Sequence, residues 1–263
     1  MGVSHVGLVR SGNEDSGFVG PTCMLVADGV GGAAAGEVAS ATAAYVVAAH
    51  LLTHHHEDPA VVLRAAVLAA QQQIVTGVLQ DPARAGMATT LTAVATDGHR
   101  VALAHVGDSR GFLFRDGSMR QLTIDHTYVQ RLVHEGTITE AEVAHHPWRH
   151  VVLRSLNGDL DEPGDIVGLD LVPGDRVLLA SDGLTDLVAE HRIEELLAAN
   201  SDDGAAQALV DEALTMGGRD NVTCLVATII DGPEIVADGA LIGAVRDPRN
   251  VVDVGAVRMP HSA

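Results

Sequence analysis

The sequence predicts an α+β domain in which antiparallel β-sheets pack together and carry helices on their outer faces. The predicted helices occur in groups between runs of short strands, which favours layered sheets over a strict β-α-β alternation. Apolar residues make up 47% of the chain but aromatic residues only 2%, so the core must consist of valine, leucine, alanine and isoleucine. The length of 263 residues is enough for one substantial core, and we therefore expect one domain.

Hydrophobic periodicity and turn residues place the elements of the first half. Residues 33–52 and 58–79 have the pattern of two consecutive helices, separated by the polar sequence THHHEDP. Four strand-like segments follow, at 89–96, 100–108, 110–117 and 118–123. They are joined by short polar turns that include Asp97-Gly98 and Asp116-Gly117, which are strong signals for tight turns. We expect these four strands to form an antiparallel meander.

The second half begins with a polar insertion at residues 124–157, which has helical spacing in two short pieces and contains the only tryptophan, Trp148. The elements predicted after it are strands at 165–171 and 175–182, helices at 191–199 and 203–216, and a strand at 221–230. Beyond Gly232 no clear period remains. We therefore predict a domain over residues 1–232 and a tail of uncertain order over 233–263, which could add one more strand.

The charge composition restricts the class of function. All 16 basic residues are arginines, and the absence of lysine excludes a phosphate-loop lysine and Schiff-base chemistry. With 35 acidic residues the net charge is −19, which opposes binding to nucleic acids and to anionic membranes. A site for a phosphate-bearing substrate would therefore need its own local positive charge, which divalent cations could supply.

The chain shows neither the pattern of a signal peptide nor an uncharged apolar run of the about 18 to 20 residues that a membrane span needs. Cys23 and Cys224 each lie inside a strand-like run, which suits reduced, buried thiols better than a disulfide. We therefore expect a cytoplasmic protein.

Four carboxylates lie at the ends of apolar strand-like runs. Asp28 and Asp182 are each followed by glycine, Asp108 ends the run VALAHVG, and Asp220 precedes the last strand. A glycine after such an aspartate lets the backbone turn and brings its carbonyl oxygen near whatever the carboxylate binds. Hard divalent cations prefer carboxylate and carbonyl oxygens. One Asp-Gly pair is an ordinary turn, but four such acids together predict a shared metal site.

Seven motifs follow one another along the chain: GLVRSGNEDS, VADGVGGAAAGEVAS, GMATTLTAV, VALAHVGDSRGFLFRDG, LTIDHT, LLASDGLTDLV and GGRDNVTCLV. In this combination the chain resembles the metal-dependent type 2C protein serine/threonine phosphatases, bacterial branch, over residues 7 to about 230. The resemblance implies two antiparallel sheets packed as a sandwich with helices outside, in four αββα layers. It also implies a binuclear Mn²⁺ or Mg²⁺ centre that hydrolyses phosphoserine and phosphothreonine in proteins.

The resemblance assigns the metal ligands. It implies that Asp28 bridges two metals, that the Gly29 carbonyl oxygen binds one of them, and that Asp182 and Asp220 hold the other. Asp108 matches the ligand of a weaker third metal. Two cations about 3.5 to 4 Å apart can lower the pKa of a bridging water and neutralise the charge that develops in phosphomonoester hydrolysis. Water is then the nucleophile, and no cysteine or serine nucleophile is needed.

Other residues match roles around the metals. Glu14 and Asp15 match the acids that reach metal-bound waters, and Asn221 matches a residue that supports the ligands. Arg10 matches the arginine that binds the substrate phosphate. Arginine suits this role because its planar fork can donate two parallel hydrogen bonds.

The histidines raise a separate question. Some members of the family carry a histidine general acid directly after the first Asp-Gly, where this chain has Val30. His126 is a candidate donor instead, although a loop or helix-capping role is the simpler interpretation. The tract at 53–57 resembles a transition-metal site but lies between two helices without a nearby cysteine. The histidines of AHHPWRH lie in the insertion, which in the family is a mobile flap beside the active site.

Two alternatives remain beside a phosphatase of general protein substrates. One is a non-catalytic metal-binding module on the same fold, and the other is a phosphatase specialised for an anti-sigma-factor antagonist. The four strand-end acids favour an enzyme over the non-catalytic module. We expect a monomer whose partners are phosphorylated substrates of a Ser/Thr kinase, with no nucleic acid or membrane partner.

Overall fold

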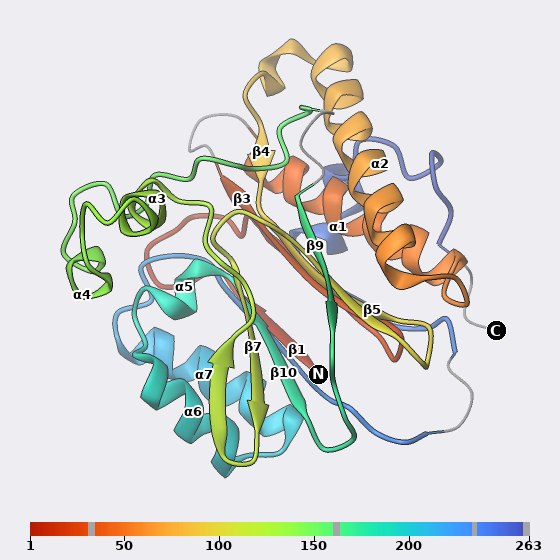
Figure 1. The fold of residues 1–263 in the computed structure, drawn as a ribbon. Helices are drawn as coiled ribbons and strands as arrows, with labels where there is room; N and C mark the ends of the chain where they lie inside the picture. The colour runs from red at the N-terminus through yellow and green to blue at the C-terminus, as the bar shows by residue number, and fades with distance from the viewer. Residues whose placement is uncertain (31–34, 160–163, 233–235, 260–263) are drawn as a thin grey trace.

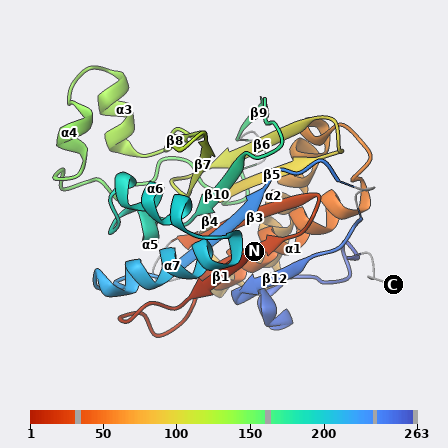
Figure 2. The same ribbon diagram turned by 90° about the horizontal axis from the view of Figure 1, so that it is seen from below.

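Two antiparallel sheets face each other, and helices cover the outer face of each, so the domain has the four layers that the sequence predicts (Figure 1). α1 (Gly36–Thr53) and α2 (Pro59–Gln80) lie on one side of the paired sheets. α6 (Glu190–Ala199) and α7 (Asp202–Thr215) lie on the other side (Figure 2). The computed structural model describes residues 1–30, 35–159, 164–232 and 236–259.

The first sheet has five strands, in the spatial order β1 (Gly2–His5), β11 (Val222–Thr228), β10 (Arg176–Ala180), β7 (Arg110–Arg115) and β8 (Ser118–Gln121). β10 lies at the centre of this sheet. Leu178 packs in the layer below α6 and α7, whereas Val177 and Leu179 pack between the two sheets. Burial of both faces explains why this strand is a continuous apolar run.

The second sheet runs in the order β12 (Ala240–Gly243), β2 (Asp15–Val19), β3 (Cys23–Val30), β5 (Leu91–Thr96), β6 (Val101–Val106) and β9 (Asp165–Leu169), and short β4 (Ala88–Thr89) pairs with the end of β3. In β3, Met24 and Val26 face the other sheet, and Leu25 and Ala27 face the helices. α1 buries mainly alanine and valine, and these small side chains let it lie close to the sheet. This close packing accommodates the low aromatic content.

The chain crosses from one sheet to the other between β6 and β7. β6 pairs with β5 and β9, whereas β7 pairs with β10 and β8. The predicted four-strand meander is therefore wrong, because it is two hairpins that belong to different sheets. Gly107 at the crossing has φ +110°, and a Cβ there would lie 2.5 Å from the Thr90 side chain. This sharp turn places Asp108 between the ends of the two sheets.

The predicted insertion is a small unit that projects beyond the sheets (Figure 1). It contains α3 (Tyr128–His134) and α4 (Glu140–Val143). Thr127 Oγ1 accepts a hydrogen bond from the Gln130 N–H and caps α3. Val129 is the one buried residue of α3, and Trp148 packs edge-on against Tyr128 with ring centroids 5.4 Å apart. Leu156 near its end is fully buried in the core beneath the second sheet, whereas α3 and α4 share little apolar surface with the body of the domain.

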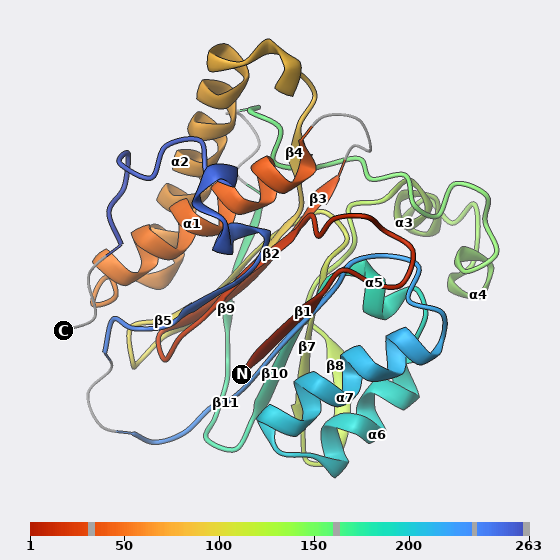
Figure 3. The ribbon, with the colours of Figure 1, turned by 180° about the vertical axis from the view of Figure 1, so that it is seen from behind.

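The chain after Gly232 adds one strand to the second sheet, a possibility that the sequence analysis had left open. β12 pairs antiparallel with β2, and the short turns η2 (Ala244–Arg246) and η3 (Pro248–Asn250) lie against α1 (Figure 3). Val245 and Val251 join the core beneath the second sheet, and the Val245 N–H donates to Ser16 Oγ at 3.1 Å. The predicted boundary at residue 232 itself stays a prediction.

Among the described residues, α2 is the one helix whose length and hydropathy would allow it to cross a membrane. Its residues Leu63, Val67 and Ile74 are instead buried in the core that α2 shares with α1 and the second sheet. Cys23 and Cys224 are both free and buried, as the sequence predicts.

The packing of the C-terminal segment leads to a stability prediction. Val245→Ala should lower the free energy of unfolding by about 2 kcal/mol, because two buried methyl-sized groups are lost and a cavity remains. Val254→Ala is the matched control, since Val254 lies in the same segment but is 46% exposed. Urea unfolding of both variants checks the prediction. Equal, small effects would show that this segment contributes little to the core.

Candidate metal centre

Two carboxylates face each other across the strand pair β2–β3. Asp15, the first residue of β2, lies directly opposite Asp28 in the antiparallel register. Asp15 is fully buried, and Ser181 Oγ donates a hydrogen bond to its Oδ2 at 2.7 Å. Its Oδ1 is buried without a hydrogen-bond partner in the described parts of the chain. A buried carboxylate oxygen without a donor is suited to a cation or to a cation-bound water.

Burial also changes the acidity of this pair. Loss of solvation raises the pKa of Asp15 to about 6. Burial raises the pKa of Asp28 well above its usual value, and the neighbouring carboxylates of Asp15 and Asp182 raise it further. The negative charges at this strand end are therefore costly unless a positive charge is placed beside them.

Two threonines fix the backbone of Asp28. The Asp28 N–H donates to Thr90 Oγ1 at 3.0 Å, and the Asp28 carbonyl oxygen accepts from Thr89 Oγ1 and from the Thr90 N–H, each at 2.8 Å. Thr90 Oγ1 also lies 2.8 Å from Ser109 Oγ, which connects this strand to the Gly107–Ser109 crossing. These bonds explain the threonine pair in GMATTLTAV, and they fix the backbone from which the Asp28 carboxylate projects.

The glycines near Asp28 permit close backbone contacts. The Gly29 N–H donates to the Glu14 carbonyl oxygen at 3.2 Å, and a Cβ on Gly29 would lie 2.5 Å from the Gly36 carbonyl oxygen. A Cβ on Gly36 would lie 2.6 Å from Glu14 Oε2. The pKa of Glu14 is raised by burial and by Glu37. Gly29 and Gly36 therefore leave room for the Glu14 side chain beside the strand end.

Asp182 begins the short helix α5 (Asp182–Thr185), directly after β10. A Cβ on Gly183 would lie 1.9 Å from the Asn221 carbonyl oxygen, so glycine is required for α5 to lie against β11. Burial raises the pKa of Asp182 well above its usual value, and the carboxylates of Asp108 and Asp186 raise it further. Asp182 thus faces carboxylates from several other segments.

Arg10 lies beside Asp220 at the mouth of β11. Arg10 Nη2 donates to Asp220 Oδ2 at 2.7 Å, and the Asn221 N–H donates to Asp220 Oδ1 at 2.8 Å. The hydrogen bond with Asp220 raises the pKa of Arg10. The Arg10 side chain is 47% exposed, so its guanidinium keeps donors that face solvent.

Asn221 holds the loop that carries Arg10 and Glu14. Its Nδ2 donates to the carbonyl oxygens of Val6 and Gly12, at 2.8 and 2.9 Å. Its Oδ1 accepts from the Glu14 N–H at 2.8 Å. All three polar groups of the side chain are used within the protein, so Asn221 positions residues 6–14 rather than facing a substrate.

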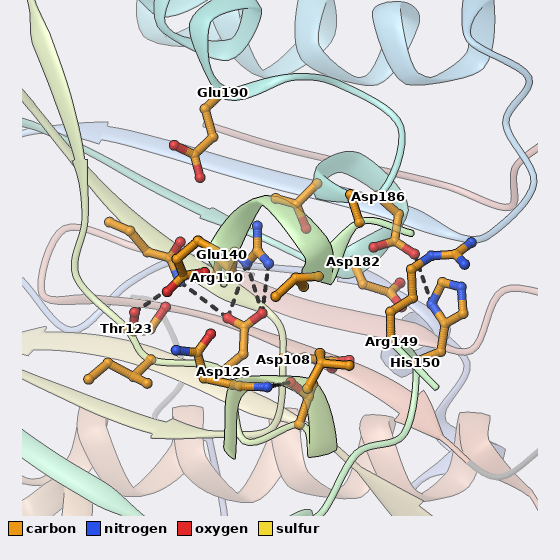
Figure 4. Close-up of a pocket in the computed structure, with 18 of the residues that line it drawn as sticks. Asp108, Arg110, Thr123, Asp125, Glu140, Arg149, His150, Asp182, Asp186 and Glu190 are labelled. Carbon is orange, nitrogen blue, oxygen red and sulfur yellow. Dashed lines mark hydrogen bonds and ion pairs between the residues drawn. The ribbon is translucent and has the colours of Figure 1, made fainter. Parts of the chain in front are cut away.

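Asp108 faces a cavity of about 710 Å³ that lies between the insertion and the body of the domain (Figure 4). Its side chain is only 9% exposed and receives no hydrogen bond from another residue in the described part of the chain. Burial, and then the carboxylates of Asp125 and Asp186, raise the pKa of Asp108 to about 7. Arg110, whose charge lowers the pKa of Asp108, forms a two-pronged ion pair with Asp125.

Asp182 and Asp186 of the α5 segment and His150 of the insertion line the same cavity (Figure 4). The donor atoms of these three residues lie within 4.8 Å of one another. No other three histidine, cysteine or acidic side chains among the described residues lie as close. The predicted ligands Asp28, Asp108 and Asp182 influence one another electrostatically, but their donor atoms are not gathered as tightly.

The donor chemistry fits a hard divalent cation. Carboxylates at the ends of β3, β6 and β10 converge. Of the arginines around them, Arg10 bonds to Asp220 and Arg110 to Asp125, and Arg149 lines the cavity beside Asp186. Burial, and then the neighbouring carboxylates, raise the pKa values of Asp28 and Asp182, so their negative charges are unfavourable there without a cation. Carboxylate oxygens and the Gly29 carbonyl oxygen form the donor set that Mn²⁺ and Mg²⁺ accept.

Sequence reasoning missed three residues of this region. Asp186 follows Asp182 by four residues, and this helical spacing in SDGLTD was a usable signal. The sequence around His150 gave no such signal, because the approach of His150 to Asp186 depends on how the insertion folds back onto the domain. Ser181, which supports Asp15, was also missed.

His126 has the loop role that the simpler interpretation gave it. The Gly107 N–H donates to its Nδ1 at 3.1 Å, and its Nε2 lies 3.1 Å from Asp165 Oδ2. It does not line the cavity. In the 53–57 tract, His54 pairs with Glu57 at 2.8 Å just beyond the end of α1.

The family model described as protein phosphatase 2C matches residues 13–215. The chain belongs to this family. Its relatives include the serine/threonine protein phosphatase PstP of Mycobacterium tuberculosis, which is 44% identical over 242 residues. That alignment covers 92% of this chain but 47% of PstP, so the chain spans about half the length of this relative. The serine/threonine phosphatase stp of Listeria welshimeri is 35% identical over 230 residues, covering 84% of this chain and 91% of stp.

Solved structures of protein phosphatase 2C relatives share the fold. A crystal structure of M. tuberculosis PstP superimposes with a TM-score of 0.81 at 43% identity, covering 88% of this chain and 98% of that one. A structure of the PstP catalytic domain in complex with two manganese ions superimposes with a TM-score of 0.80 at 42% identity, covering 88% and 97%. The predicted family and the sandwich of two antiparallel sheets are both confirmed.

The raised carboxylate pKa values predict how pH affects the chelator-treated protein. Asp108 has a pKa of about 7 when folded, against a usual value of 3.8. The folded chain therefore binds more protons than the unfolded chain between these values, and stability must fall as pH rises through this window. One such group changes the free energy of unfolding by about 1.4 kcal/mol per pH unit.

Urea unfolding in excess chelator should therefore give a lower midpoint at pH 8 than at pH 5, and Mn²⁺ should restore the midpoint at pH 8. Asp108→Asn should reduce the pH dependence, because the amide does not titrate. A midpoint that rises from pH 5 to pH 8 equally in both proteins would contradict this account.

Proposed function

We propose that the chain hydrolyses phosphoserine and phosphothreonine in proteins, using Mn²⁺ or Mg²⁺ held at the strand-end carboxylates. The observation that carries the proposal is the convergence of the buried Asp15 with the half-buried Asp28 and Asp182, whose carboxylates raise one another's pKa values. Membership of the protein phosphatase 2C family supports the reaction. The two manganese ions in the PstP catalytic domain support the choice of cation.

In this proposal Asp28, the Gly29 carbonyl oxygen, Asp182 and Asp220 hold two cations, and Asp108 contributes to a weaker third. When bound, the cations supply positive charge that activates water and stabilises the charge developing on the phosphate. The protein's own contribution is to fix the ligands before substrate arrives. Threonines fix the Asp28 backbone, and Ser181 fixes Asp15.

Arg10 is proposed to bind the substrate phosphate. One of its nitrogens bonds to Asp220, which orients the guanidinium over the strand end while leaving other donors exposed. Asn221 supports this orientation because it closes the loop that carries Arg10. A planar fork held in this way can donate to two phosphate oxygens together.

We infer that the protein works as a monomer in the cytoplasm on substrates of a Ser/Thr kinase. The two free, buried cysteines agree with a reducing compartment. The net charge of −19 disfavours nucleic acids and anionic membranes as partners.

Turnover of p-nitrophenyl phosphate tests the proposed reaction. We expect hydrolysis with Mn²⁺ and with Mg²⁺ and none in excess chelator. Asp28→Asn should lower kcat by at least about 100-fold, because even residues that only support a metal ligand contribute about 10- to 100-fold.

Asp116→Asn is the matched control for Asp28→Asn. Asp116 also precedes a glycine at a strand end, but it lies in the β7–β8 turn, and at its φ of +52° asparagine is tolerated. Turnover that is absent with every cation would favour the non-catalytic module, and turnover that is unchanged in Asp28→Asn would remove Asp28 from the catalytic metal site.

Arg10→Lys tests phosphate binding. Lysine keeps the charge but loses the fork, so we expect KM to rise several-fold with a smaller effect on kcat. Steady-state kinetics with p-nitrophenyl phosphate measure both constants. Arg64→Lys, an exposed exchange on α2, is the control. A KM equal to that of the unmodified chain would remove Arg10 from the phosphate site.

A further inference from the structure

The C-terminal segment at 236–259 lies beside the strand whose first residue is Asp15, in dark blue next to α1 and β2 in Figure 3. It lies beyond residues 13–215, which the family model matches. β12 of this segment pairs antiparallel with β2, and Gly243 stands opposite Ser16 in the register. Gly243 has φ +76°, and a Cβ there would lie 2.2 Å from the Asp15 carbonyl oxygen. The segment therefore contacts the backbone from which a buried carboxylate of the site projects.

Two hydroxyl groups lie in the otherwise apolar buried face of α1. They belong to Ser40 and Thr42, and both side chains are fully buried. Thr42 Oγ1 accepts a hydrogen bond from the Val252 N–H of the C-terminal segment at 3.1 Å. Ser40 Oγ instead lies 3.0 Å from Ser16 Oγ and donates to the Glu14 carbonyl oxygen. Ser40 thus reaches the chain at the start of β2, beside the proposed metals.

The hydrogen bonds around Ser40 run in one direction. A hydroxyl group has one proton to donate. Ser40 gives its proton to the Glu14 carbonyl oxygen, because its other acceptor, the Glu37 carbonyl oxygen, is 3.4 Å away. Ser16 must then donate to Ser40 Oγ, and Ser16 Oγ in turn accepts from the Val245 N–H at 3.1 Å. A buried chain of hydrogen bonds, which we call the serine relay, therefore leads from Val245 through Ser16 and Ser40 to Glu14.

The serine relay ends on a carbonyl oxygen that also holds Gly29. The Gly29 N–H donates to the Glu14 carbonyl oxygen at 3.2 Å, and the Glu14 N–H donates to Asn221 Oδ1 at 2.8 Å. Of the two donors to the Glu14 carbonyl oxygen, the Ser40 hydroxyl is the closer. Without it, this carbonyl group would be held by one hydrogen bond at the long end of the normal range. The Glu14 side chain and the Gly29 backbone would then be less firmly placed.

We propose that the C-terminal segment positions the metal site through the serine relay, with Ser16 and Ser40 as positioning residues for Glu14 and Gly29. The proposal rests on the proposed function in that Glu14 and Gly29 lie at the proposed metals. Coupling between two sites is reciprocal. An ion bound at the strand ends must therefore stabilise the docking of the C-terminal segment in return.

Amide hydrogen exchange of residues 240–252 in the full chain, followed by mass spectrometry, tests this reciprocal effect. Mn²⁺ should slow the exchange by at least about 5-fold in the unmodified chain, the lower end of typical coupling between sites. At Mn²⁺ concentrations that saturate each protein, this slowing should be lost in Ser40→Ala, because the bound ion still stabilises the fold as a whole and only the relay is broken. Ser16→Ala should lose it too, which provides a second variant if Ser40→Ala is poorly folded.

Thr42→Val is the matched control, because it removes a buried hydroxyl of α1 that bonds to the same C-terminal segment and keeps the shape of the side chain. This variant should keep the slowing of exchange by Mn²⁺. Calorimetric titration should show Mn²⁺ affinity lowered by about 10-fold in Ser40→Ala, as for other residues that support a metal ligand, and unchanged in Thr42→Val.

Three results would overturn the proposed coupling and leave the segment a purely structural part of the sheet. They are an exchange rate at 240–252 that Mn²⁺ does not change in the unmodified chain, slowing that persists in both serine variants, and an equal loss in Thr42→Val. Turnover of p-nitrophenyl phosphate separates these results from failure of the proposed function. Turnover without the coupling would reject the serine relay alone, whereas coupling without turnover would reject the proposed function alone.

Discussion

Repulsion among buried carboxylates is the constraint on which the rest of this structure depends. Asp15, Asp28, Asp108 and Asp182 are brought together by strand ends and by one sheet crossing, and burial raises the pKa of each. Bringing four carboxylates this close together lowers the stability of the folded chain, so stability alone does not account for the arrangement. The unfavourable free energy of gathering these carboxylates must be offset by burial of apolar side chains elsewhere. Three apolar layers of small, closely packed side chains provide that burial next to the polar end of the sandwich.

The two sides of the site are built differently. On one side, backbone and side-chain hydrogen bonds from Thr90, Ser181 and Asn221 hold the strand ends and the loop at residues 6–14. On the other side, the insertion forms a wall with few buried residues of its own. Ligand geometry can therefore remain constant while the wall of the cavity adapts to what enters it.

Most of the fold follows from local patterns in the sequence, because turn residues and apolar periods determine strands and helices directly. The crossing between β6 and β7 could not be predicted in this way, since DSR is as short as a hairpin turn and only pairing with β9 and β10 separates the two strands. The strand-end position of Asp28 and Asp182 was visible in the sequence. The approach of His150 to Asp186 was not, because it depends on the path of a 34-residue polar insertion.

β12 has a consequence for the exposed edges of the molecule. It pairs with β2, the strand that carries Asp15, and so covers backbone groups that would otherwise face solvent as an unpaired edge. A free edge next to Phe18 and Val19 would offer a template for strand pairing with another copy of the chain. The segment after Gly232 therefore makes the shorter strand β12 the outer edge of the sheet in place of β2, and it also holds the strand from which a buried carboxylate projects.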